Sequence, residues 1–560
     1  MREIDRLTTD RFGVPSLTLM ESAATSVARA VVDALSGNVA SGSILIFCGK
    51  GNNGGDGAAA ARLLATMGGR VDLVLLGKVD DTKGDARINF DRARTWGEAE
   101  ALPEANSSAP TESGLINLFE CDSARGWEQL SASILAAPHD AIVDALFGTG
   151  LTRPVEGLHR EAIDYINRQR LTRDQPPYSR YPVISIDIPS GLNSDTEQPI
   201  GALVQADVTV TMTAPKRANV LPPASHFNGK LIVAPIGSPK ELLDEANRDL
   251  FLTEADDARH WLIETRYQPD SYKNTHGHAL VIAGSRGFTG AAALCGNAAM
   301  RAGAGLVTVA TPASAQPLVA TQVMPEVMTT ALAETDRGAA TDEAVDYAMK
   351  FAERADVIAV GPGLSSEDDR TRKFVRAIVK KRRTAMVIDA DGLNCVAPWP
   401  TELHGSDELP IVLTPHSGEM LRLLGTDDKS ALDDRVAAAR AFATKHHVIL
   451  LLKGSRAIIA APDGRVFINA TGNAGLGTAG AGDTLTGVIT GCIAQAAAYH
   501  VPDGHDRVST IESVIAAAYI SGLAGDFAAR EIGMRAMVAS DIREHLSEAF
   551  RSLDPEGEKP

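Results

Sequence analysis

The chain has 560 residues, of which 44% are apolar and 22% charged, and its net charge is −17. That length is too great for one ordinary domain, and that composition is typical of globular proteins in solution. The acidic excess argues against a general binder of nucleic acid or of anionic membranes, so we expect neither as a partner.

The five cysteines lie far apart and form no C-x-x-C pair. A scattered, odd-numbered set predicts neither a disulfide framework nor a zinc site and suits a reducing compartment. The charged N-terminus lacks the apolar core of a signal peptide, so we expect a cytoplasmic protein. The best candidate for a membrane span, residues 484–502, contains Thr, Gln, His, Tyr and Pro, and we interpret it as a buried core helix.

The first part of the chain alternates strand-like apolar runs with helical patterns, among them residues 57–67 and 159–169. Several runs are continuously apolar, which is typical of parallel strands buried on both faces. We therefore predict a Rossmann-like, three-layer α/β domain over residues 1–240. Its strand-like runs are 43–47, 71–76, 141–147, 182–188, 206–212 and 229–236.

A polar, charged stretch without a strand-like run follows, and we interpret residues 241–264 as a connector. A second alternating series then predicts another α/β domain over residues 265–555. Residues 101–116 and the tail, 554–560, are predicted to be loops or frayed ends. The second series consists of 278–284, 305–311, 355–361, 384–390, 410–415, 447–454 and 456–462.

A glycine-rich segment, CGKGNNGGDG (48–57), lies between the first strand-like run and a helical pattern. It matches the G-x-G-x-x-G dinucleotide fingerprint only weakly, because Asp72 stands at the beginning of the next strand and not at its end. It is not a Walker A loop, because Lys50 is followed by glycine. Bare glycine backbone before a helix would let N–H groups approach an anion, so we predict phosphate or nucleotide contact, the alternative being a structural turn.

Polar side chains stand at the ends of three predicted strands of the first domain. Asn53 follows the first strand, and Asp144 lies in the third. Asp187 and Ser190 end the fourth. Ligands gather beyond the carboxyl ends of parallel strands, and Asn and Asp oxygens suit a cation or ligand hydroxyls. Lys216 ends a further strand, where it could neutralise a phosphate or be a surface lysine.

Four stretches of the first domain resemble the N-terminal YjeF family of NAD(P)H-hydrate epimerases. The resemblance runs from the start of the chain to about residue 236 and implies interconversion of the R and S forms of NADHX and NADPHX, which are nicotinamide dinucleotides hydrated at C6. The stretches are LTLMESAA (17–24), GKGNNGGDG (49–57), DALFGTG (144–150) and DIPSGLNSDTEQPIGA (187–202).

The same resemblance implies roles for particular residues. Asp187 would lie at the nicotinamide and act as acid or base, which a carboxylate does well when burial raises its pKa. Asn53, Asp144 and Ser190 would hold a potassium ion. The residues that would contact the dinucleotide, besides Asp187, are Asn52, Asn53, Gly54, Gly55, Asp56, Gly148, Thr149, Gly150, Leu151, Thr152, Arg153 and Pro154.

The strongest motif of the chain is NAGLGTAGAGDTLTGVITG, residues 473–491. Its glycines lead into Asp483 and a helical pattern over residues 484–498, where exposed N–H groups would bind an anion. A carboxylate beside a phosphate makes sense as the base that takes a proton from a hydroxyl attacking that phosphate. The alternative is an N-cap aspartate beside a glycine-rich loop.

This G-x-G-D element resembles the ribokinase-like superfamily, so we expect a ribokinase-like α/β fold. Further stretches narrow the resemblance, from about residue 270 to 550, to the C-terminal YjeF family of ADP/ATP-dependent NAD(P)H-hydrate dehydratases. They are KNTHGHALVIAGSRGFTGAAAL (273–294), GPGL (361–364), VIDADGLN (387–394), LTPHSGEM (413–420) and LLKGSRAII (451–459).

The resemblance implies that ADP or ATP phosphorylates the C6 hydroxyl and that loss of phosphate then restores NAD(P)H. Asp483 would activate the hydroxyl, and Mg²⁺ would neutralise the transferring phosphoryl group. His416, taken alone, could equally be a core or loop histidine. The implied contacts to NAD(P)HX are Ala291, Ala292, Gly363, His416 and Asp483, and those to the nucleotide are Lys453, Gly454, Ser455, Arg456, Ala457, Gly480 and Gly482.

Together these motifs predict a bifunctional, homo-oligomeric repair enzyme that uses K⁺, Mg²⁺ and ADP or ATP. G-x-G-D alone also allows a small-molecule kinase of the ribokinase-like superfamily fused to a nucleotide-binding module. A stable phosphorylated product would indicate the kinase, whereas the return of NADH absorbance with AMP and phosphate would indicate the dehydratase.

Overall fold

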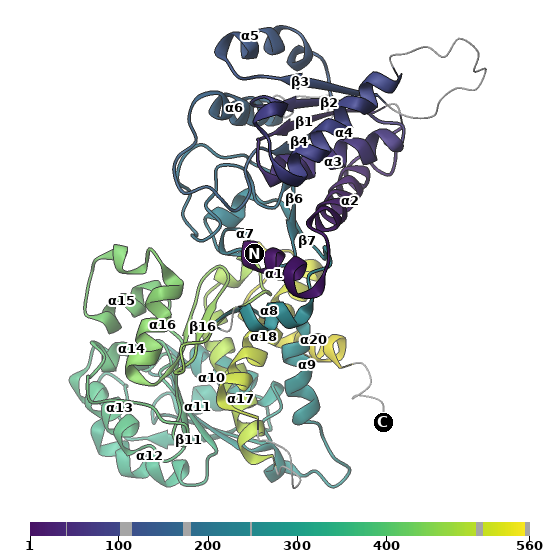
Figure 1. The fold of residues 1–560 in the computed structure, drawn as a ribbon. Coiled ribbons are helices and arrows are strands. Elements are labelled where there is room, and N and C mark those ends of the chain that lie inside the picture. The colour runs from purple at the N-terminus through teal and green to yellow at the C-terminus, as the bar shows by residue number, and fades with distance from the viewer. Residues whose placement is uncertain (41, 101–114, 172–180, 247–248, 500–507, 555–560) are drawn as a thin grey trace. The chain divides into compact units, whose positions relative to one another are not determined.

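The computed structural model describes residues 1–40, 42–100, 115–171, 181–246, 249–499 and 508–554. The chain divides into two compact units, Met1–Asn247 and Arg248–Pro560 (Figure 1). Most of the expected loop at 101–116 and all but the first residue of the expected frayed tail lie outside the described residues.

The first unit is built on a parallel sheet whose described strands run in the order β3-β2-β1-β4-β5-β6-β7. Every strand but β3 was predicted, and β3 begins at residue 116, where a loop was expected. The strands are β1 (Ser43–Cys48), β2 (Arg70–Leu75), β3 (Ile116–Glu120), β4 (Ala141–Ala145), β5 (Val183–Ile186), β6 (Val208–Met212) and β7 (Lys230–Ala234).

Helices cover both faces of this sheet, which confirms the three-layer prediction. In β1, Ile44 and Ile46 pack into a core with α2 and α3, whereas Leu45 and Phe47 pack into a second core with α5 and α6 (Figure 1). Alternate residues of a strand face opposite sides, so a continuously apolar run serves both cores. The helices are α1 (Arg2–Phe12), α2 (Ser16–Ala34), α3 (Asn52–Thr66), α4 (Gly84–Glu100), α5 (Ala124–Ala132), α6 (Gly157–Leu171), α7 (Arg217–Val220) and α8 (Lys240–Ala246).

The second unit contains a larger sheet, with its described strands in the order β11-β10-β9-β12-β13-β14-β15-β16-β17-β8. The strands from β11 to β15 are parallel, and β16 is antiparallel to both of its neighbours. The strands are β8 (Leu250–Leu252), β9 (His278–Ile282), β10 (Leu306–Pro312), β11 (Met328–Leu332), β12 (Val357–Val360), β13 (Ala385–Ile388), β14 (Ile411–Leu413), β15 (Ile449–Leu452), β16 (Ile458–Ala460) and β17 (Val466–Ile468).

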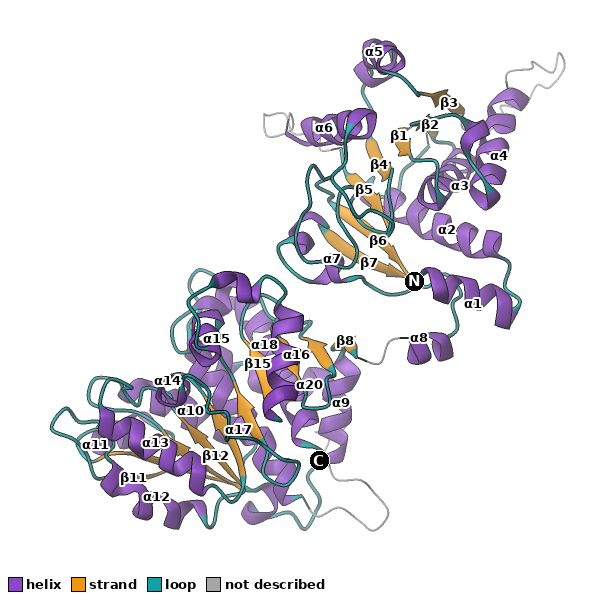
Figure 2. Ribbon diagram, turned by 60° about the vertical axis from the view of Figure 1, so that its left-hand side comes forward, coloured by secondary structure: helices purple, strands orange, loops and turns teal. Residues whose placement is uncertain are grey.

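Helices also flank this sheet (Figure 2). Val357 and Ala359 of β12 join a core with α10, α17 and α18, and their neighbours Ile358 and Val360 are fully buried as well. The helices are α9 (Ala255–Glu264), α10 (Thr289–Arg301), α11 (Gln316–Gln322), α12 (Val345–Ala352), α13 (Asp369–Lys381), α14 (Asp391–Val396), α15 (Ser417–Leu424), α16 (Arg435–His446), α17 (Ala481–Ala498), α18 (Thr510–Ile532), α19 (Ala539–Glu544) and α20 (Leu546–Leu553).

The interpretation of residues 241–264 as a connector needs correction. The strand β8 pairs in parallel with β17, and the rings of Phe251 and Phe467 stack with their centroids 5.1 Å apart. The helix α9 packs on α18, and its Trp261 lies in the core of the second unit. Residues 250–264 therefore belong to that unit, and β8 escaped prediction because a three-residue edge strand leaves no readable periodicity.

The prediction of a buried core helix over residues 484–502 is confirmed up to Ala498, where α17 ends, because most side chains of α17 are buried, and residues 500–502 lie outside the described residues. In the described part of the chain, α18 is the one helix long and apolar enough to cross a membrane, and 67% of its most apolar window is buried inside the unit.

Candidate active sites

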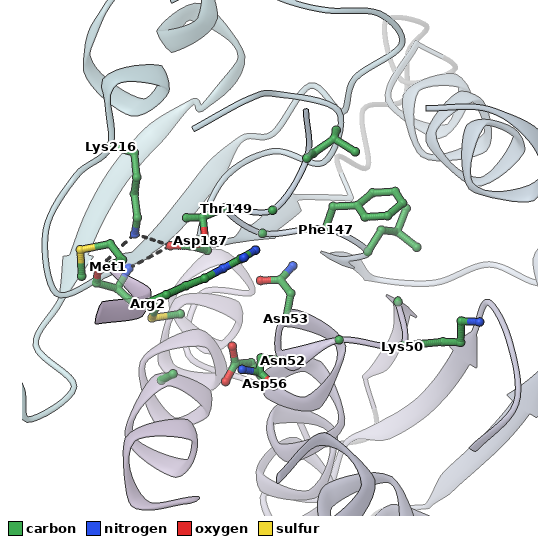
Figure 3. Close-up of a pocket in the computed structure, with 18 of the residues that line it drawn as sticks. Met1, Arg2, Lys50, Asn52, Asn53, Asp56, Phe147, Thr149, Asp187 and Lys216 are labelled. Atoms are coloured by element: carbon green, nitrogen blue, oxygen red, sulfur yellow. Dashed lines mark hydrogen bonds and ion pairs between the residues drawn. The ribbon is translucent and has the colours of Figure 1, made fainter. Parts of the chain in front are cut away.

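A cavity of about 990 Å³ opens in the first unit, beyond the carboxyl ends of the strands (Figure 3). The strand order reverses between β1 and β4, and open parallel sheets bind ligands where the order reverses. The cavity is lined by the start of α3, by the segment after β4, by Asp187 after β5 and by Lys216 after β6. Predicted contacts among its lining are Asn52, Asn53, Asp56, Gly148, Thr149, Gly150, Leu151, Thr152, Arg153, Pro154 and Asp187.

Gly54 and Gly55 were predicted to contact the dinucleotide, but the structure places them behind the cavity wall. A Cβ on Gly54 would overlap the carbonyl oxygen of Gly49, and one on Gly55 would come within 2.8 Å of the Cα of Ala86. These glycines let the start of α3 approach its own turn and α4 closely. Both glycines are needed for this packing and neither lines the cavity, and their contact with the dinucleotide stays a prediction.

We expect Gly54→Ala to destabilise the first unit by about 3 kcal/mol, because the backbone oxygen of Gly49 cannot move aside as a flexible side chain would. Thermal unfolding should show a lower melting temperature for this unit. Gly51→Ala is a matched control in the same turn, because an added Cβ there meets nothing within 4 Å. Equal melting temperatures for the two variants would contradict the packing role.

The side chains of Asn53 and Asp187 converge on Gly148 from two different strand ends. A Cβ on Gly148 would lie 3.2 Å from Oδ1 of Asn53 and 3.3 Å from Oδ2 of Asp187, so glycine keeps this space free. Within the described residues, Nδ2 of Asn53 is buried and lacks a hydrogen-bond partner. Buried polar groups are normally paired, so this donor is available to a ligand.

Asp187 forms a buried ion pair with Lys216 (Figure 3). Asp187 has a φ of 71°, in the left-handed region, which turns the chain sharply after β5. The Lys216 ammonium also donates to Oγ1 of Thr211 at 2.9 Å and to the carbonyl of Met212 at 3.1 Å. Only 8% of Lys216 is exposed, so it is not a surface lysine. Its positive charge is paired with the carboxylate of Asp187.

Asp56 adds a second carboxyl group to this cavity. Burial raises its pKa well above the usual range, and the nearby charges of Asp187 and Asp5 raise it further. The cavity thus holds a carboxyl group that favours its protonated form beside a carboxylate that is paired with a lysine. Such a difference between two neighbouring acids is typical of acid and base partners.

Asp144 and Ser190, two of the three predicted potassium ligands, are in direct contact. The Ser190 hydroxyl donates to Oδ1 of Asp144 at 2.6 Å, and the Ser190 N–H and the Ser185 hydroxyl each donate to Oδ2 at 2.8 Å. Burial raises the pKa of Asp144, although these hydrogen bonds oppose the rise. Its hydrogen-bond partners are neutral, so a monovalent cation would fit this oxygen-rich, fully buried carboxylate.

Asn53, the third predicted potassium ligand, approaches this pair through the segment after β4. Phe147 accepts and donates hydrogen bonds with Ser190 through its backbone, at 3.3 and 2.9 Å, and the next residue, Gly148, faces Asn53. The segment after β4 therefore connects the three predicted ligands. Asp144 lies before it, Ser190 contacts the backbone of Phe147, and Asn53 faces Gly148.

In the second unit, the predicted residues again gather beyond the carboxyl ends of parallel strands. Lys453 follows β15 and pairs with Asp389, which follows β13, at 2.7 Å between Nζ and Oδ1. Asp389 is 1% exposed and accepts a second hydrogen bond, at 2.7 Å, from the hydroxyl of Thr486 in α17. Asp389 was missed as a site residue, although its place at a strand end in VIDADGLN is the signal that marks such residues.

Asp483 lies in the first turn of α17 and is not its N-cap. The N-cap is Gly480, with a φ of 84° and no side-chain capping bond, which rejects the N-cap interpretation. Burial and, to a smaller extent, the charge of Asp389 raise the pKa of Asp483 to about 6, although Lys453 opposes the rise. A Cβ on Gly482 would lie 3.3 Å from Nζ of Lys453, so this glycine lets the ammonium approach the helix start.

Two of the predicted NAD(P)HX contacts of this unit meet at a second strand end. Gly363 follows β12 with a φ of 63°, and a Cβ there would lie 3.0 Å from Cβ of Ala291 at the start of α10. Ala292 does not share this position, because it is fully buried in the core. The side chain of Ala292 therefore packs in the core, and the predicted contact of this residue with NAD(P)HX stays a prediction for its backbone.

His416 caps α15 through its side chain. Its Nδ1 accepts from the N–H groups of Gly418 at 3.0 Å and Glu419 at 3.4 Å, while Glu419 accepts from the His416 N–H at 2.8 Å. With 55% of its side chain exposed, His416 is not a core histidine. The capping bonds fix the ring and leave Nε2, 3.5 Å from the Glu419 carboxylate, on its outer edge.

The predicted nucleotide contacts from Lys453 to Ala457 form the turn between β15 and β16. Gly454 has a φ of 148°, and a Cβ there would approach the Arg435 guanidinium to 2.9 Å. The carbonyl of Ser455 accepts from Arg435 at 3.1 Å. Arg456 is turned inward to the Ala470 carbonyl, and burial lowers its pKa.

Comparisons with known proteins agree with this arrangement. Residues 16–218 match the family model described as YjeF-related protein N-terminus, and residues 279–548 match the one described as NAD(P)H-hydrate dehydratase. A protein of Moorella thermoacetica named bifunctional NAD(P)H-hydrate repair enzyme Nnr is 38% identical, over 100% of this chain and 97% of its own. The chain belongs to the bifunctional NAD(P)H-hydrate repair enzyme family. This membership does not favour the alternative of a small-molecule kinase fused to a binding module.

Two crystal structures are similar to the second part of the chain. An ADP/ATP-dependent NAD(P)H-hydrate dehydratase from Bacillus subtilis, co-crystallised with ATP and Mg²⁺, is 26% identical and covers 55% of this chain and 100% of its own, with a TM-score of 0.45. A ribokinase-like superfamily protein from Enterococcus faecalis is also 26% identical and covers 54% of this chain and 96% of its own, with a TM-score of 0.46.

Proposed function

We propose that the two sites of this bifunctional NAD(P)H-hydrate repair enzyme divide the work. The first would epimerise R- and S-NAD(P)HX, and the second would dehydrate the S form with ADP or ATP. The observation that carries this proposal is that each site sets a lysine among carboxyl groups beyond the ends of parallel strands. Lys216 pairs with Asp187 in the first site, and Lys453 pairs with Asp389 beside Asp483 in the second.

In the first site, inversion at C6 needs the hydroxyl to leave and to return to the other face. We assign proton donation to Asp56, because burial raises its pKa well above the usual range of a carboxyl group. Asp187, which is paired with Lys216, would accept a proton from the water that adds to the other face of C6, and proton exchange with solvent would restore both carboxyl groups. The free Nδ2 of Asn53 would donate to the substrate beside them.

In the second site, Asp483 would take the proton of the C6 hydroxyl as that oxygen attacks the terminal phosphoryl group. Lys453 and the N–H groups at the start of α17 would hold the phosphates. Phosphate then departs from C6, where hydroxide would leave poorly, and a proton leaves C5 to solvent, so the C5–C6 double bond of the nicotinamide ring forms again.

Mg²⁺ usually binds to substrate phosphates with only one or two protein carboxylates, and when bound it would neutralise phosphoryl charge. The described residues contain no group of three or more acidic, His or Cys side chains that could hold a metal. The carboxylates of Asp483 and Glu419 beside Lys453 fit an ion that arrives with the nucleotide.

We expect the kcat/KM of dehydration to fall tenfold for each pH unit below about 6, because Asp483 acts only when deprotonated. Above that pH the rate should reach a plateau. Steady-state rates from pH 4.5 to 8 would locate the acid limb, and Asp389→Asn should move it to lower pH, since Asp389 raises this pKa. A limb near pH 4 in the unchanged enzyme would contradict the assignment.

We also expect K⁺ to stabilise the first unit, because Asp144 is buried without a cationic partner among its hydrogen bonds. A ligand at about 100 times its Kd adds about 2.7 kcal/mol to the free energy of unfolding. The melting temperature should therefore be higher in KCl than in choline chloride of equal concentration. Asn53→Ala should abolish this difference in melting temperature. Equal melting temperatures of the unchanged protein in the two salts would contradict the proposed K⁺ site.

The proposed function is tested by incubating mixed R- and S-NADHX with ADP and Mg²⁺. Complete recovery of NADH absorbance, with AMP and phosphate as products, is expected from both epimers. Recovery from the S form alone would refute the first activity, and a stable phosphorylated product without NADH would refute the second. The free, buried cysteines support our expectation that the enzyme works in the cytoplasm, and its homo-oligomeric state stays a prediction for light scattering.

A further inference from the structure

A second cavity, of about 630 Å³, lies in the second unit beside α13, α14 and α15. Two arginines line it, Arg372 from α13 and Arg422 from α15. The rest of its lining is polar or small, and the described lining contains one acidic residue, Asp427. In a chain with a net charge of −17, a cavity with two arginines stands out as a site for an anion.

The guanidinium of each arginine is held by one hydrogen bond from its Nε and forms no ion pair among the described residues. Nε of Arg372 donates to the carbonyl of Ser366 at 2.7 Å, and Nε of Arg422 donates to Oδ1 of Asn394 at 2.8 Å. Across the described residues, neither guanidinium lies within 4.0 Å of a carboxylate oxygen. A guanidinium held in place in this way keeps the donors that bind phosphate oxygens in pairs, at little cost in side-chain entropy.

The cavity shares two segments of the chain with the candidate site for NAD(P)HX, the loop after β12 and the helix α15. Ser366 follows Gly363 on the loop after β12, and Arg422 lies on the helix that His416 caps. A Cβ on Gly418 would be 3.3 Å from Nδ1 of His416 and 3.9 Å from Nη1 of Arg422, so the guanidinium reaches back toward the cap. Two of the segments that line the cavity thus also carry residues implied to contact the substrate, Gly363 and His416.

The length of the substrate makes these shared segments relevant to its binding. The reacting nicotinamide end would lie near Asp483, and the rest of the dinucleotide must extend away from it with its phosphate charges. Lys453 and the start of α17 would be occupied by the phosphates of ADP or ATP. The phosphates of the dinucleotide need other cationic partners, and Arg372 and Arg422 offer two guanidinium groups, one of them near the His416 cap.

We propose that Arg372 and Arg422 form a subsite for a phosphate group of the dinucleotide substrate, either its pyrophosphate or the 2′-phosphate of NADPHX. This inference rests on the proposed dehydratase function of the second unit. The subsite acts on binding and not on the chemical step, because neither Asp483 nor Lys453 lines this cavity.

The test measures the KM and kcat of dehydration for S-NADHX and for S-NADPHX, with saturating ADP, in Arg372→Gln and Arg422→Gln. We expect KM to rise about tenfold or more and kcat to stay within about twofold. A rise for S-NADPHX alone identifies the 2′-phosphate as the ligand, and a rise for both substrates identifies the pyrophosphate.

Arg376→Gln is the matched control. Arg376 lies on the same helix as Arg372 and donates from Nε to the carbonyl of Cys395 at 2.9 Å, but it does not line the cavity. If Arg422→Gln lowers the melting temperature, Arg422→Lys is used in its place. Its KM should still rise, because the lysine ammonium lacks the paired N–H donors of a guanidinium. KM values no higher than those of Arg376→Gln, for both substrates, would overturn the subsite. Failure of the unchanged enzyme to dehydrate either substrate would instead refute the proposed function.

Discussion

Replacing Asp483 by Asn is expected to lower the kcat of dehydration by about a thousandfold, because the amide has the same shape but cannot take the proton of the C6 hydroxyl. General bases contribute roughly a hundredfold to ten-thousandfold to such rates. The variant should fold normally, since burial of Asp483 raises its pKa and makes its charge unfavourable in the folded state. NADH absorbance with S-NADHX, ADP and Mg²⁺ measures the effect.

Two internal controls sharpen this test. The variant should interconvert R- and S-NADHX at the unchanged rate, because the first unit has its own site, and this would exclude general unfolding. Asp368→Asn is a matched control in the second unit, since Asp368 is an N-cap of α13 and Asn caps helices as well as Asp does. Dehydration by Asp483→Asn at the rate of Asp368→Asn would show that Asp483 is not the base.

The alternating pattern of the sequence predicted most strands, including β7 at a sheet edge, and missed the edge strands β3, β8 and β11 and the short inner strand β17. β1 is visible because all six of its residues are buried. β3 is half exposed, and β8 and β17 have only three residues each. These strands are therefore too exposed or too short to leave a long continuous apolar run. Edge strands gain their pairing from a neighbour distant in sequence, and a local pattern cannot report that neighbour.

Strand ends predicted most of the candidate site residues, but not which of them touch. Lys216 and Asp389 both stand at strand ends, yet their partners, Asp187 and Lys453, are 29 and 64 residues away in sequence. Only the strand order sets β5 beside β6 and β13 near β15. For this reason the sequence left Lys216 undecided and gave Asp389 no role.

Small residues in the motifs posed a different difficulty. Gly54 and Ala292 stand within stretches that resemble ligand-binding loops, and both are closely packed, one against the Gly49 carbonyl and one in the core. Gly148 lies in a similar stretch and faces the cavity between Asn53 and Asp187. A glycine needed by a ligand and a glycine needed by a neighbouring backbone look the same in sequence, because both are defined by what lies outside the local chain.

Replacing Asp187 by Asn is expected to slow the interconversion of R- and S-NADHX by about a hundredfold or more, because the carboxylate that takes back the proton is lost. The backbone should remain in place, since asparagine adopts a φ of 71° readily. Exchange between the epimers, followed without ADP so that the second site stays silent, measures the rate.

The stability of the same variant separates catalysis from structure. Asp187→Asn leaves the ammonium of Lys216 buried with a neutral partner, which should cost about 2 kcal/mol in the free energy of unfolding. Adding Lys216→Met removes the stranded charge and should restore much of that loss, because an apolar side chain of similar length tolerates burial. Epimerisation should stay slow in the double variant although its stability recovers. Restoration of both together would mean that Asp187 serves only to neutralise Lys216, and Asp56 would then be the acid and base of this site.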